Sequence, residues 1–576
     1  MSADTVADLF VRTLVQAGVE RIYGIVGDSL NGLTEALRQQ GEIDWVHVRH
    51  EESAAFAAGA EAHLTDRLAV CAGSCGPGNL HLINGLFDCH RSQVPVLAIA
   101  AQIPSAEIGR HYAQETHPQT LFAECSHFCE MVSTPEQMPG VLESAIRAAL
   151  GLRGVAVIVI PGDVALMKAP SEARSSASLL PPVPIVRPDP GTIEALAAIL
   201  NATNRITLFC GRGCRGAHDE LIRLAERLKA PIVHALGGKE GVEYDNPFTV
   251  GMTGLIGFSS GHDALQACEV LVMLGTDFPY RQFYPTGAKV IQVDLRVEVL
   301  GRRCPIDLGV VGDVGATIAA LLPSLLPKPD QIHLDDSLSK YAKARQDLDD
   351  LAVGHPGHTP IHPQYLTKVI SDLAAEDAIF TCDVGTPTIW AARYLKMTQQ
   401  RRLIGSFTHA SMANALPQAL GAQAAFPERQ VISLSGDGGF TMLMGDLITL
   451  TQHALPVKIV IFNNGTLAFV ELEMKVAGFL ETRVDLVNPD FAAMARAMGI
   501  FALRVEDPAD LAAAVRQILA HDGPALLDVV TNRQELAMPP HTTLTQGLGF
   551  GLYALKAMMN GQGDDLVDLA RSNLFR

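Results

Sequence analysis

Two adjoining stretches decide the fold of this chain: SLSGDGGFTMLMGDL at residues 433–447 and VKIVIFNNGTLAF at residues 457–469. Each follows or includes a hydrophobic run without polar alternation, which is typical of a strand buried on both faces of a parallel sheet. Asp437 lies in a glycine turn after the first run, and Asn464 follows the second. Because neighbouring parallel strands end at one edge, a carboxylate and an amide oxygen are expected at one crevice.

This crevice has the ligands that a metal-bound diphosphate requires. Magnesium prefers hard oxygen ligands and leaves its other positions to phosphate oxygens and water. A glycine turn at the start of a helix also lets the backbone approach a phosphate closely. A GDG turn alone is common after strands. Its pairing with NN after the next strand predicts a Mg²⁺ site that holds a diphosphate cofactor.

The same alternation of hydrophobic runs and helical patterns extends along most of the chain, for example at residues 96–101 and 155–160. We therefore predict an α/β fold built from doubly wound parallel sheets. Proline-rich stretches at residues 179–192 and from about residue 322 indicate linkers. The predicted units are residues 1–183, 184–338 and 339–534, followed by a C-terminal segment at residues 535–576.

Composition excludes several classes of protein. The net charge of −18 is unsuited to nucleic acid, which would require a basic face, and it disfavours simple electrostatic attachment to anionic lipid. The N-terminus lacks the basic region of a signal peptide, and no apolar run reaches the roughly 18 residues of a spanning helix. The ten cysteines include three pairs spaced four apart, which we interpret as buried thiols rather than zinc ligands. These features predict a cytoplasmic protein with reduced thiols.

A second candidate site residue lies near the N-terminus. The sequence RHEESAAFAAGAEA at residues 49–62 places Glu51 between a predicted strand and an alanine-rich helix. A carboxyl group in an apolar pocket can hold a proton near neutral pH and act in proton transfer. An acid in a first helical turn also stabilises the helix dipole, so position alone leaves both roles open.

The GDG and NN pair resembles the thiamine diphosphate motif of the acetohydroxyacid synthase and pyruvate oxidase superfamily. Further segments in matching order include GIVGDSLNGL, QETHP and GSFTHASMANALPQALGAQ. From about residue 5 to the C-terminus, the chain resembles the ubiquinone-dependent pyruvate dehydrogenases, also called acetate-forming pyruvate oxidases. The resemblance implies a pyrimidine-binding domain, an FAD-binding domain, a diphosphate-binding domain and a membrane-binding C-terminal segment. It also implies a homotetramer whose active sites lie between subunits.

The resemblance assigns roles to individual residues. Asp437, Asn464 and the carbonyl of Thr466 would bind Mg²⁺, and Glu51 of a partner subunit would bond N1′ of the aminopyrimidine. Met412 would support the thiamine ring, Gln114 and Glu473 would line the substrate pocket, and Phe469 would assist electron transfer. His81 and His90 fit either the pocket or the core. The cofactor contacts implied for thiamine diphosphate are Ala410, Ser411, Met412, Asp437, Gly438, Gly439, Asn464, Gly465, Thr466, Leu467, Ala468, Phe469 and Val470.

The middle unit contains a GxGxxG string at Gly211, Gly213 and Gly216, which is a weak signal by itself. The resemblance instead implies that FAD lies extended across several strand ends, where Asp294 suits a ribose hydroxyl. The implied FAD contacts are Gly254, Leu255, Ile256, Gly257, Gly275, Thr276, Asp277, Phe278, Pro279, Asp294, Leu295, Arg296, Val297 and Glu298.

The implied reaction is oxidative decarboxylation of pyruvate to acetate and carbon dioxide, with electrons passed through FAD to ubiquinone.

The amphipathic pattern of residues 563–576 predicts a helix that either docks permanently on the core or binds membrane lipid. The resemblance favours lipid, on the cytoplasmic face of the inner cell membrane when the enzyme is activated.

The alternative functions are an acetolactate-forming carboligase, an oxygen- and phosphate-dependent pyruvate oxidase, or a non-catalytic scaffold. Ala113 replaces a phenylalanine of the family, so a bulkier 2-oxo acid would also fit.

Overall fold

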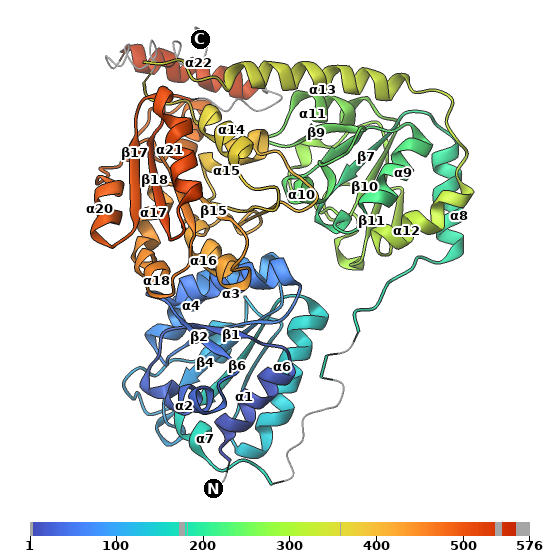
Figure 1. The fold of residues 1–576 in the computed structure, drawn as a ribbon. Helices are drawn as coiled ribbons and strands as arrows, with labels where there is room; N and C mark the ends of the chain where they lie inside the picture. Colours follow the sequence, from blue (N-terminus) through green and yellow to red (C-terminus); the bar gives the residue numbers. More distant parts are fainter. Residues whose placement is uncertain are drawn as a thin grey trace.

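The structure, a computed structural model, describes residues 4–171, 179–180, 182–357, 359–535, 544–559 and 569, with the backbone alone for residues 544–551. It contains three six-stranded sheets in which every strand pairing is parallel, with helices on both faces (Figure 1). The predicted α/β fold of three doubly wound domains is therefore confirmed.

The first domain has the strand order β2-β1-β3-β4-β6-β5. Its strands are β1 (Arg21–Gly24), β2 (Asp44–His47), β3 (Ala69–Gly73), β4 (Val96–Gln102), β5 (Phe128–Met131) and β6 (Val155–Pro161). Its helices are α1 (Val6–Gln16), α2 (Asn31–Gln40), α3 (Glu51–Thr65), α4 (Pro77–Arg91), α5 (Pro118–Leu121), α6 (Met138–Leu152) and α7 (Gly162–Leu166). Strands β4 and β6 are buried at every position, which explains their continuous hydrophobic sequences.

The second domain has the strand order β12-β11-β10-β7-β8-β9. Its strands are β7 (Ile206–Cys210), β8 (Ile232–His234), β9 (Thr249–Met252), β10 (Val270–Leu274), β11 (Lys289–Asp294) and β12 (Leu308–Val311). Its helices are α8 (Pro190–Asn201), α9 (His218–Leu228), α10 (Lys239–Val242), α11 (Ser259–Ala267) and α12 (Val314–Leu321), followed by the short turn η8 (Leu322–Ser324). The strand order reverses between β7 and β10, the point where doubly wound sheets bind ligands.

The third domain has the strand order β14-β13-β15-β16-β18-β17. Its strands are β13 (Ile379–Cys382), β14 (Arg402–Gly405), β15 (Val431–Gly436), β16 (Lys458–Asn463), β17 (Phe501–Val505) and β18 (Ala525–Val530). Its helices are α14 (Pro363–Leu373), α15 (Thr386–Tyr394), α16 (Ala415–Ala425), α17 (Asp437–Leu443), α18 (Leu447–Gln452), α19 (Ala468–Val476), α20 (Phe491–Ala497) and α21 (Pro508–Ala520). Here the order reverses between β13 and β15.

The long helix α13 (Ile332–Leu351) joins the second and third domains (Figure 1). The predicted boundary at residue 338 falls inside this helix. A last helix, α22 (Leu544–Met559), follows the third sheet. The predicted amphipathic helix at residues 563–576 lies outside the described residues, apart from Leu569. None of the described helices is long and apolar enough to cross a membrane.

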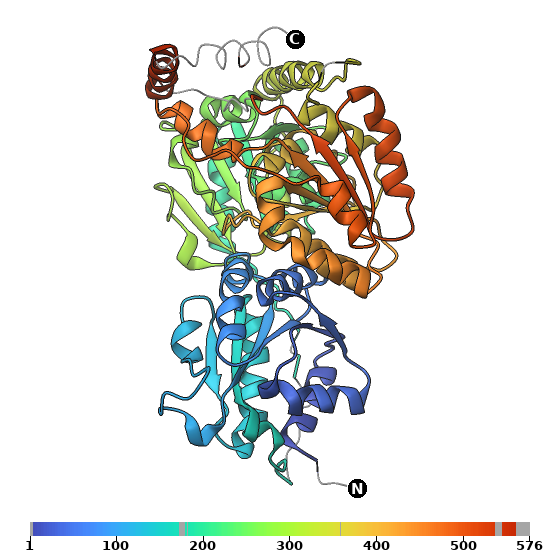
Figure 2. The ribbon, with the colours of Figure 1, turned by 90° about the vertical axis from the view of Figure 1, so that its left-hand side faces the viewer.

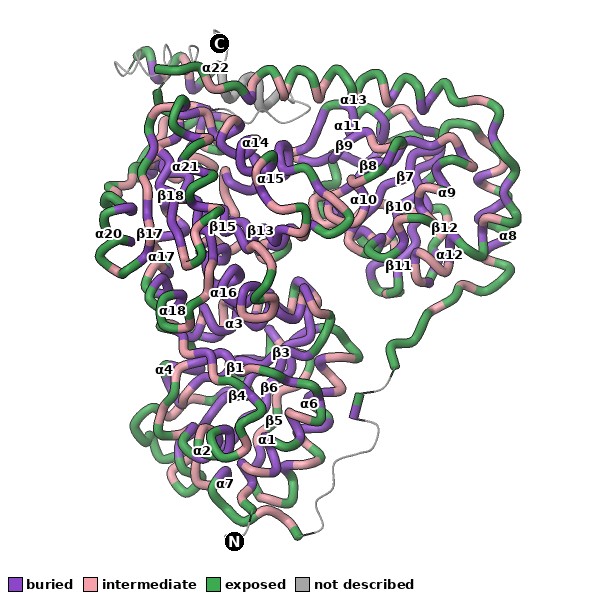
Figure 3. The backbone as a smooth tube through the Cα atoms, in the orientation of Figure 1, coloured by how far each residue is buried: buried purple, intermediate pink, exposed green. Residues whose placement is uncertain are grey.

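The first and third domains meet through α3, which packs on both α4 and α16. Figures 1 and 2 show the first domain at the bottom, with α3 and α4 lying beneath the helices of the third domain. Gly421 permits this close approach, because a Cβ at that position would overlap the carbonyl of Ala57. Figure 3 shows that α3 and most strands are buried, while the outer helices carry the exposed residues. Helix α3 is therefore held against the third domain.

Candidate active site

Asp437 lies at the carboxyl end of β15, beside the point where the strand order of the third sheet reverses. The residue is 3% exposed, and its Oδ2 accepts hydrogen bonds from the backbone N–H groups of Asn464 at 3.1 Å and Gly465 at 2.7 Å. Burial raises the pKa of Asp437, and these hydrogen bonds oppose that rise. The structure thus brings the GDG and NN segments together, as their positions after neighbouring strands predicted.

The turn after β16 presents the second group of predicted ligands. Gly465 has a φ of 68°, a left-handed conformation that favours glycine. Asn464 Oδ1 accepts a hydrogen bond from the backbone of Thr466 at 3.1 Å, and the Thr466 hydroxyl donates to Glu471 at 2.8 Å. The turn is therefore held in place before any ion binds. The assignment of Asp437, Asn464 and Thr466 as metal ligands stays a prediction.

Two further groups at this edge were missed by the sequence analysis. Asn488 donates from Nδ2 to Asp437 at 2.8 Å and to Asn463 at 2.9 Å. No sequence pattern marks Asn488, because it reaches the site from a long loop before α20. The other group is the N-terminus of α15, where Gly385 precedes Thr386 with a φ of 142°. Its sequence signal is a hydrophobic strand followed by DVGTP, which resembles the arrangement at Asp437.

Helix α15 adds a second helix N-terminus to the crevice. A Cβ on Gly436 would lie 3.7 Å from Pro387, so the start of α15 is beside the end of β15. Free N–H groups and the helix dipole at such termini favour a phosphate group. A narrow cleft here is lined by residues that include Thr386, Asn464 and Ala468. Two helix N-termini and the turn predicted to bind a metal therefore face one crevice.

Asp383 is a buried acid beside this crevice. It is 1% exposed, its Oδ1 accepts a hydrogen bond from the backbone of Ala415 at 2.9 Å, and a Cβ on Gly439 would lie 2.6 Å from its Oδ2. Burial raises the pKa of Asp383 to about 7. The carboxyl group thus lies between the Met412 loop and the glycine turn of the diphosphate site.

We expect Asp383→Asn to stabilise the cofactor-free protein increasingly as pH rises. The pKa of Asp383 is higher in the folded protein than in the unfolded chain, so the folded protein binds the proton more tightly. The free energy of unfolding therefore falls as pH rises from the unfolded pKa toward about 7. Asparagine is neutral throughout and escapes this loss. Thermal denaturation of both proteins, at pH values well below and above 7, measures the effect. A stability difference that does not change with pH would contradict the prediction.

The loop between β14 and α16, which carries Met412, has a strained backbone at two alanines. Ala410 and Ala413 on either side have φ values of 65° and 68°, which are unfavourable for residues other than glycine. Asn414 anchors the loop by donating to the carbonyl of Cys382 at 2.9 Å. Strain of about 1 kcal/mol or more per residue persists where the surroundings hold it, typically at binding sites. Met412 is half-buried at the same edge as the diphosphate crevice.

Glu51 is the first residue of α3 and is 6% exposed. Its Oε2 lies 2.9 Å from His81 Nδ1, and the His81 ring stacks on His50 with 4.4 Å between centroids. Of the two predicted roles of His81, the structure thus places its ring in contact with the candidate catalytic acid Glu51. His90 instead packs against His127, so the structure places it in a different contact.

Gln114 lies on the same side of the first domain as Glu51. Its Oε1 accepts from the thiol of Cys75 at 3.3 Å, and its Cβ lies against Gly76 at the start of α4. A Cβ on Gly78, also in this turn, would lie 3.1 Å from Glu51 Oε1. The N-terminus of α4 thus groups Gln114 and Glu51, while Ala113 is exposed in the adjoining loop.

Within one chain, Asn84 connects this group to the Met412 loop. Its Nδ2 donates to Glu52 Oε1 at 2.7 Å and to Ser411 Oγ at 2.9 Å. His409 Nε2 lies 2.9 Å from Asn84 Oδ1. Asn84 is therefore the contact between the first and third domains, and Glu52 holds its amide group from within the first domain. The predicted action of Glu51 on a cofactor held by a partner subunit remains a prediction.

Helix α19 carries the remaining predicted residues. Phe469 is half-buried, whereas Glu473 is exposed in the single chain. The buried acid on this helix is Glu471, which accepts from Lys475 at 2.6 Å and from Arg533 at 3.1 Å. Because Glu471 also accepts a hydrogen bond from the Thr466 hydroxyl, it joins α19 to the turn after β16.

All three segments predicted to contact FAD lie at one edge of the second sheet. They are GLIG (residues 254–257) after β9, GTDFP (275–279) after β10, and DLRVE (294–298), which begins at the last residue of β11. Asp294 is 7% exposed, and burial raises its pKa. Gly211 and Gly213 pack directly on Gly275, since a Cβ on Gly213 would lie 2.7 Å from Gly275 Cα. These two glycines therefore serve backbone packing at the reversal between β7 and β10.

The fold and the first crevice define an α/β protein with a site for a diphosphate cofactor. Residues 4–121, 193–321 and 383–529 match the N-terminal thiamine pyrophosphate (thiamine diphosphate) binding domain, the central domain and the C-terminal binding domain of thiamine pyrophosphate enzymes. The chain therefore belongs to the thiamine pyrophosphate enzyme family and contains its two cofactor-binding domains.

Individual relatives differ in what they are named for. The chain is 35% identical over 99% of both chains to the putative thiamine pyrophosphate-containing protein YdaP of Bacillus subtilis. It is 31% identical to the pyruvate oxidase of Lactiplantibacillus plantarum, over 90% of this chain and 87% of that one. It is also 29% identical to a probable acetolactate synthase large subunit of Methanocaldococcus jannaschii, over 94% of each.

Proposed function

We propose that this chain is a thiamine diphosphate-, Mg²⁺- and FAD-dependent enzyme that oxidatively decarboxylates pyruvate to acetate and carbon dioxide. Electrons would pass to ubiquinone at the cytoplasmic face of the inner cell membrane, where the otherwise cytoplasmic homotetramer would bind through its C-terminal segment. The observation that carries this proposal is the docking of α22 on α19. The matched family domains end at residue 529, so α22 is an addition to them.

The first and third domains contain groups suited to thiamine diphosphate. The α15 and α17 N-termini would hold the diphosphate, and Asp437, Asn464 and Thr466 would hold Mg²⁺. Bound thiamine diphosphate supplies the carbanion and the electron sink for decarboxylation. Glu51 would hold a proton against the aminopyrimidine, Met412 would orient the ring, and Gln114 would contact pyruvate. The exposed Ala113 leaves space beside Gln114, which supports acceptance of bulkier 2-oxo acids.

The second domain has groups suited to FAD. The hydroxyl of Thr253, directly before GLIG, is buried and has no hydrogen-bond partner among the described groups. Buried polar groups are normally paired, so a ligand with polar atoms fits this edge. Asp294 lies at the carboxyl end of β11, on the same edge of the sheet, with its Oδ1 accepting from the backbone of Arg296 at 3.0 Å. These groups support a flavin lying across the three strand ends.

Arg393 links the two cofactor regions. It lies on α15, is 7% exposed, and donates from Nε to the Ile256 carbonyl at 3.0 Å and from Nη2 to the Gly257 carbonyl at 3.4 Å. Since α15 begins at the diphosphate crevice, Arg393 would fix the GLIG turn relative to the thiamine site. We interpret it as a positioning residue.

Arg393→Met is therefore expected to lower flavin retention at least about tenfold while leaving thiamine diphosphate affinity unchanged. The ratio of flavin to protein after gel filtration and a separate thiamine diphosphate titration measure this. Arg401→Met is a matched control, because Arg401 is also buried and bonds backbone carbonyls, but within the third domain. Equal flavin loss in both variants would show general destabilisation instead.

Helix α22 contacts α19 through one face and exposes apolar residues on the other. Tyr553 and Ala557 are buried, Lys556 Nζ donates to the Gly478 carbonyl at 2.7 Å, and Lys475 Nζ lies 5.6 Å from the Tyr553 ring centroid. The exposed face comprises Leu552, Leu555, Met558 and Met559. An exposed apolar face supports contact with lipid. The opposite face of α22 docks on α19, the helix that carries Phe469.

The proposal is tested by deleting residues 563–576. We expect pyruvate-dependent reduction of a soluble dye to be unchanged, whereas lipid-stimulated activity, quinone reduction in vesicles and pyruvate-dependent pelleting with liposomes are lost. The double variant Leu552→Ser/Leu555→Ser should weaken pelleting without removing the segment. If the truncated enzyme still pellets and reduces membrane quinone normally, the segment is structural and the quinone proposal is wrong.

Carboligation to acetolactate is a second candidate function, because the chain is also similar to a probable acetolactate synthase. Anaerobic addition of pyruvate separates the two functions, because oxidation of the substrate must bleach the flavin. Acetolactate formation without bleaching would assign the chain to the ligases, and acetyl phosphate formation with oxygen would assign it to the phosphate-dependent oxidases.

A further inference from the structure

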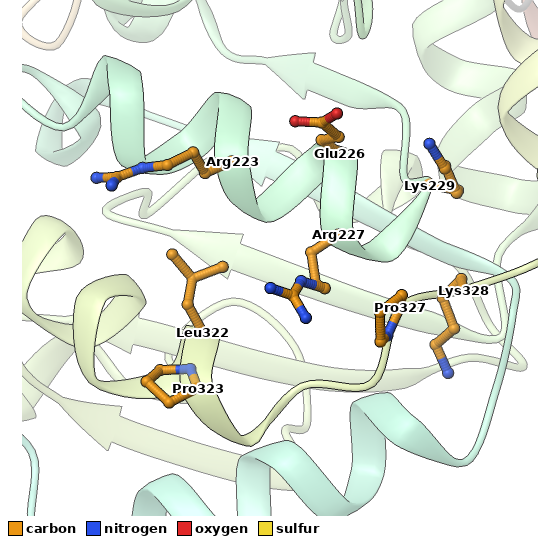
Figure 4. Close-up of a pocket in the computed structure, with 8 residues that line it drawn as sticks. All are labelled: Arg223, Glu226, Arg227, Lys229, Leu322, Pro323, Pro327 and Lys328. Atoms are coloured by element: carbon orange, nitrogen blue, oxygen red, sulfur yellow. The ribbon is translucent and has the colours of Figure 1, made fainter.

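A cavity of about 580 Å³ lies in the second domain between α9 and the segment that follows α12. It is lined by Arg223, Glu226, Arg227, Lys229, Leu322, Pro323, Pro327 and Lys328. Figure 4 shows Arg227 reaching from α9 into the space between the Leu322–Pro323 turn and Pro327. The side chain of Glu226 leaves α9 in the opposite direction in this view. Four of the eight lining residues are cations, in a chain whose net charge is −18.

Two of these cations have a simple structural explanation. Arg227 lies in the last turn of α9 and Lys229 directly follows it, where positive charge offsets the negative end of the helix dipole. Arg223 likewise pairs with Glu220 at 2.7 Å on the same helix. These three residues alone would not indicate a ligand.

Lys328 is not explained in this way. It is 7% exposed, and its Nζ donates one hydrogen bond, to the carbonyl of Asn201 at 2.9 Å. No carboxylate of the described residues lies within ion-pair distance of it, and burial lowers its pKa. A lysine that is largely buried at the wall of a cavity, with no carboxylate beside it, is suited to pairing with an anion in that cavity.

Hydrogen bonds join the segments around the cavity to one another. Asn201 donates from Nδ2 to the carbonyl of Ser324 at 3.0 Å, and its Oδ1 accepts from the backbone of Leu326 at 2.9 Å. The backbone of Lys328 donates to the Arg227 carbonyl at 3.1 Å, and Arg227 Nη1 donates to the Leu325 carbonyl at 3.2 Å. The cationic groups are therefore held in place without a ligand, which reduces the entropy cost of binding.

The cavity is separate from both cofactor regions. It lies where α9 ends, and β8 begins at Ile232 shortly after it, so it is at the amino edge of the second sheet. The segments predicted to contact FAD follow the carboxyl ends of β9, β10 and β11, at the opposite edge. An anion bound here would therefore not overlap the flavin.

We propose that this cavity binds a phosphate-bearing anion, either a nucleoside monophosphate or free phosphate. Lys328 and Arg227 would contact the phosphate oxygens, since both side chains donate charge-assisted hydrogen bonds. Leu322, Pro323 and Pro327 form an apolar wall suited to the uncharged part of such a molecule. Glu226 is the one acid in the lining and opposes the anion.

The test is calorimetric titration of the full chain saturated with thiamine diphosphate, Mg²⁺ and FAD, so that the cofactor sites are filled. AMP and inorganic phosphate are expected to bind saturably, and adenosine, which lacks the phosphate, is not. Equal affinities for AMP and phosphate identify free phosphate as the ligand, whereas tighter AMP binding identifies a nucleotide. Absence of saturable binding by both anions, or equal binding of adenosine and AMP, overturns the proposal.

Variants assign the binding to this cavity. Lys328→Met is expected to weaken binding of the anions by about tenfold or more, and Glu226→Gln to strengthen it severalfold by removing a like charge. Lys396→Met, an exposed lysine of the third domain, is the control and should leave affinity unchanged. If Lys328→Met does not fold, the exposed Glu226→Gln variant decides. Affinities that neither cavity variant changes would place the anion elsewhere and overturn the assignment.

Discussion

Glu51→Gln is expected to lower turnover by roughly 10²- to 10⁴-fold, the usual contribution of a positioned proton-transfer group. Glutamine keeps the size of the buried side chain and a group that can bond His81, so the fold should be retained. It cannot supply or accept the proton that activation of the aminopyrimidine requires. The measurement is steady-state turnover of pyruvate at saturating thiamine diphosphate and Mg²⁺.

Glu52→Gln provides a matched control for this change. It alters the next acid of the same helical turn, whose contact is with Asn84 rather than His81. Its turnover should remain close to that of the wild type. Near-normal turnover of Glu51→Gln would contradict the catalytic role of Glu51 and leave it as an acid that stabilises the start of α3.

Asp437→Asn is expected to abolish Mg²⁺-dependent binding of thiamine diphosphate at ordinary cofactor concentrations. Loss of the carboxylate removes the one charged group of the proposed ligand set. Asparagine is preferable to alanine here, because Asp437 accepts from the buried N–H groups of Asn464 and Gly465. Leaving such donors unpaired would cost about 1–3 kcal/mol each. An alanine variant could then lose cofactor binding because it is unstable rather than because a metal ligand is missing.

The flavin of this variant is the internal control. FAD is predicted to bind the second domain, so its content after gel filtration should not change. Thiamine diphosphate binding is measured by titration at fixed Mg²⁺. Simultaneous loss of flavin would show misfolding, or that the two cofactor regions do not belong to different domains.

Much of this architecture was predictable from the sequence. The runs at residues 96–101 and 155–160 became β4 and β6 because uninterrupted hydrophobic side chains require burial on both faces of a sheet. Asp437 and Asn464 were predictable as neighbours because each follows a strand, and the ends of parallel strands share one edge. Local patterns of this kind depend on residues close together in the chain.

Contacts between distant segments were decided by the tertiary structure alone. Asn488 reaches Asp437, Asp383 lies beneath Gly439, and Arg393 holds the turn at Ile256. The residues of each pair lie far apart along the chain, and no periodicity relates them. Similarly, His81 fitted two roles until α4 placed its ring against Glu51. The three sheets and the position of the diphosphate turn were predictable from local patterns, because hydrophobic runs and glycine turns act over a few residues. Which buried polar groups surround that turn depends on how the sheets pack, and packing is a property of the folded chain.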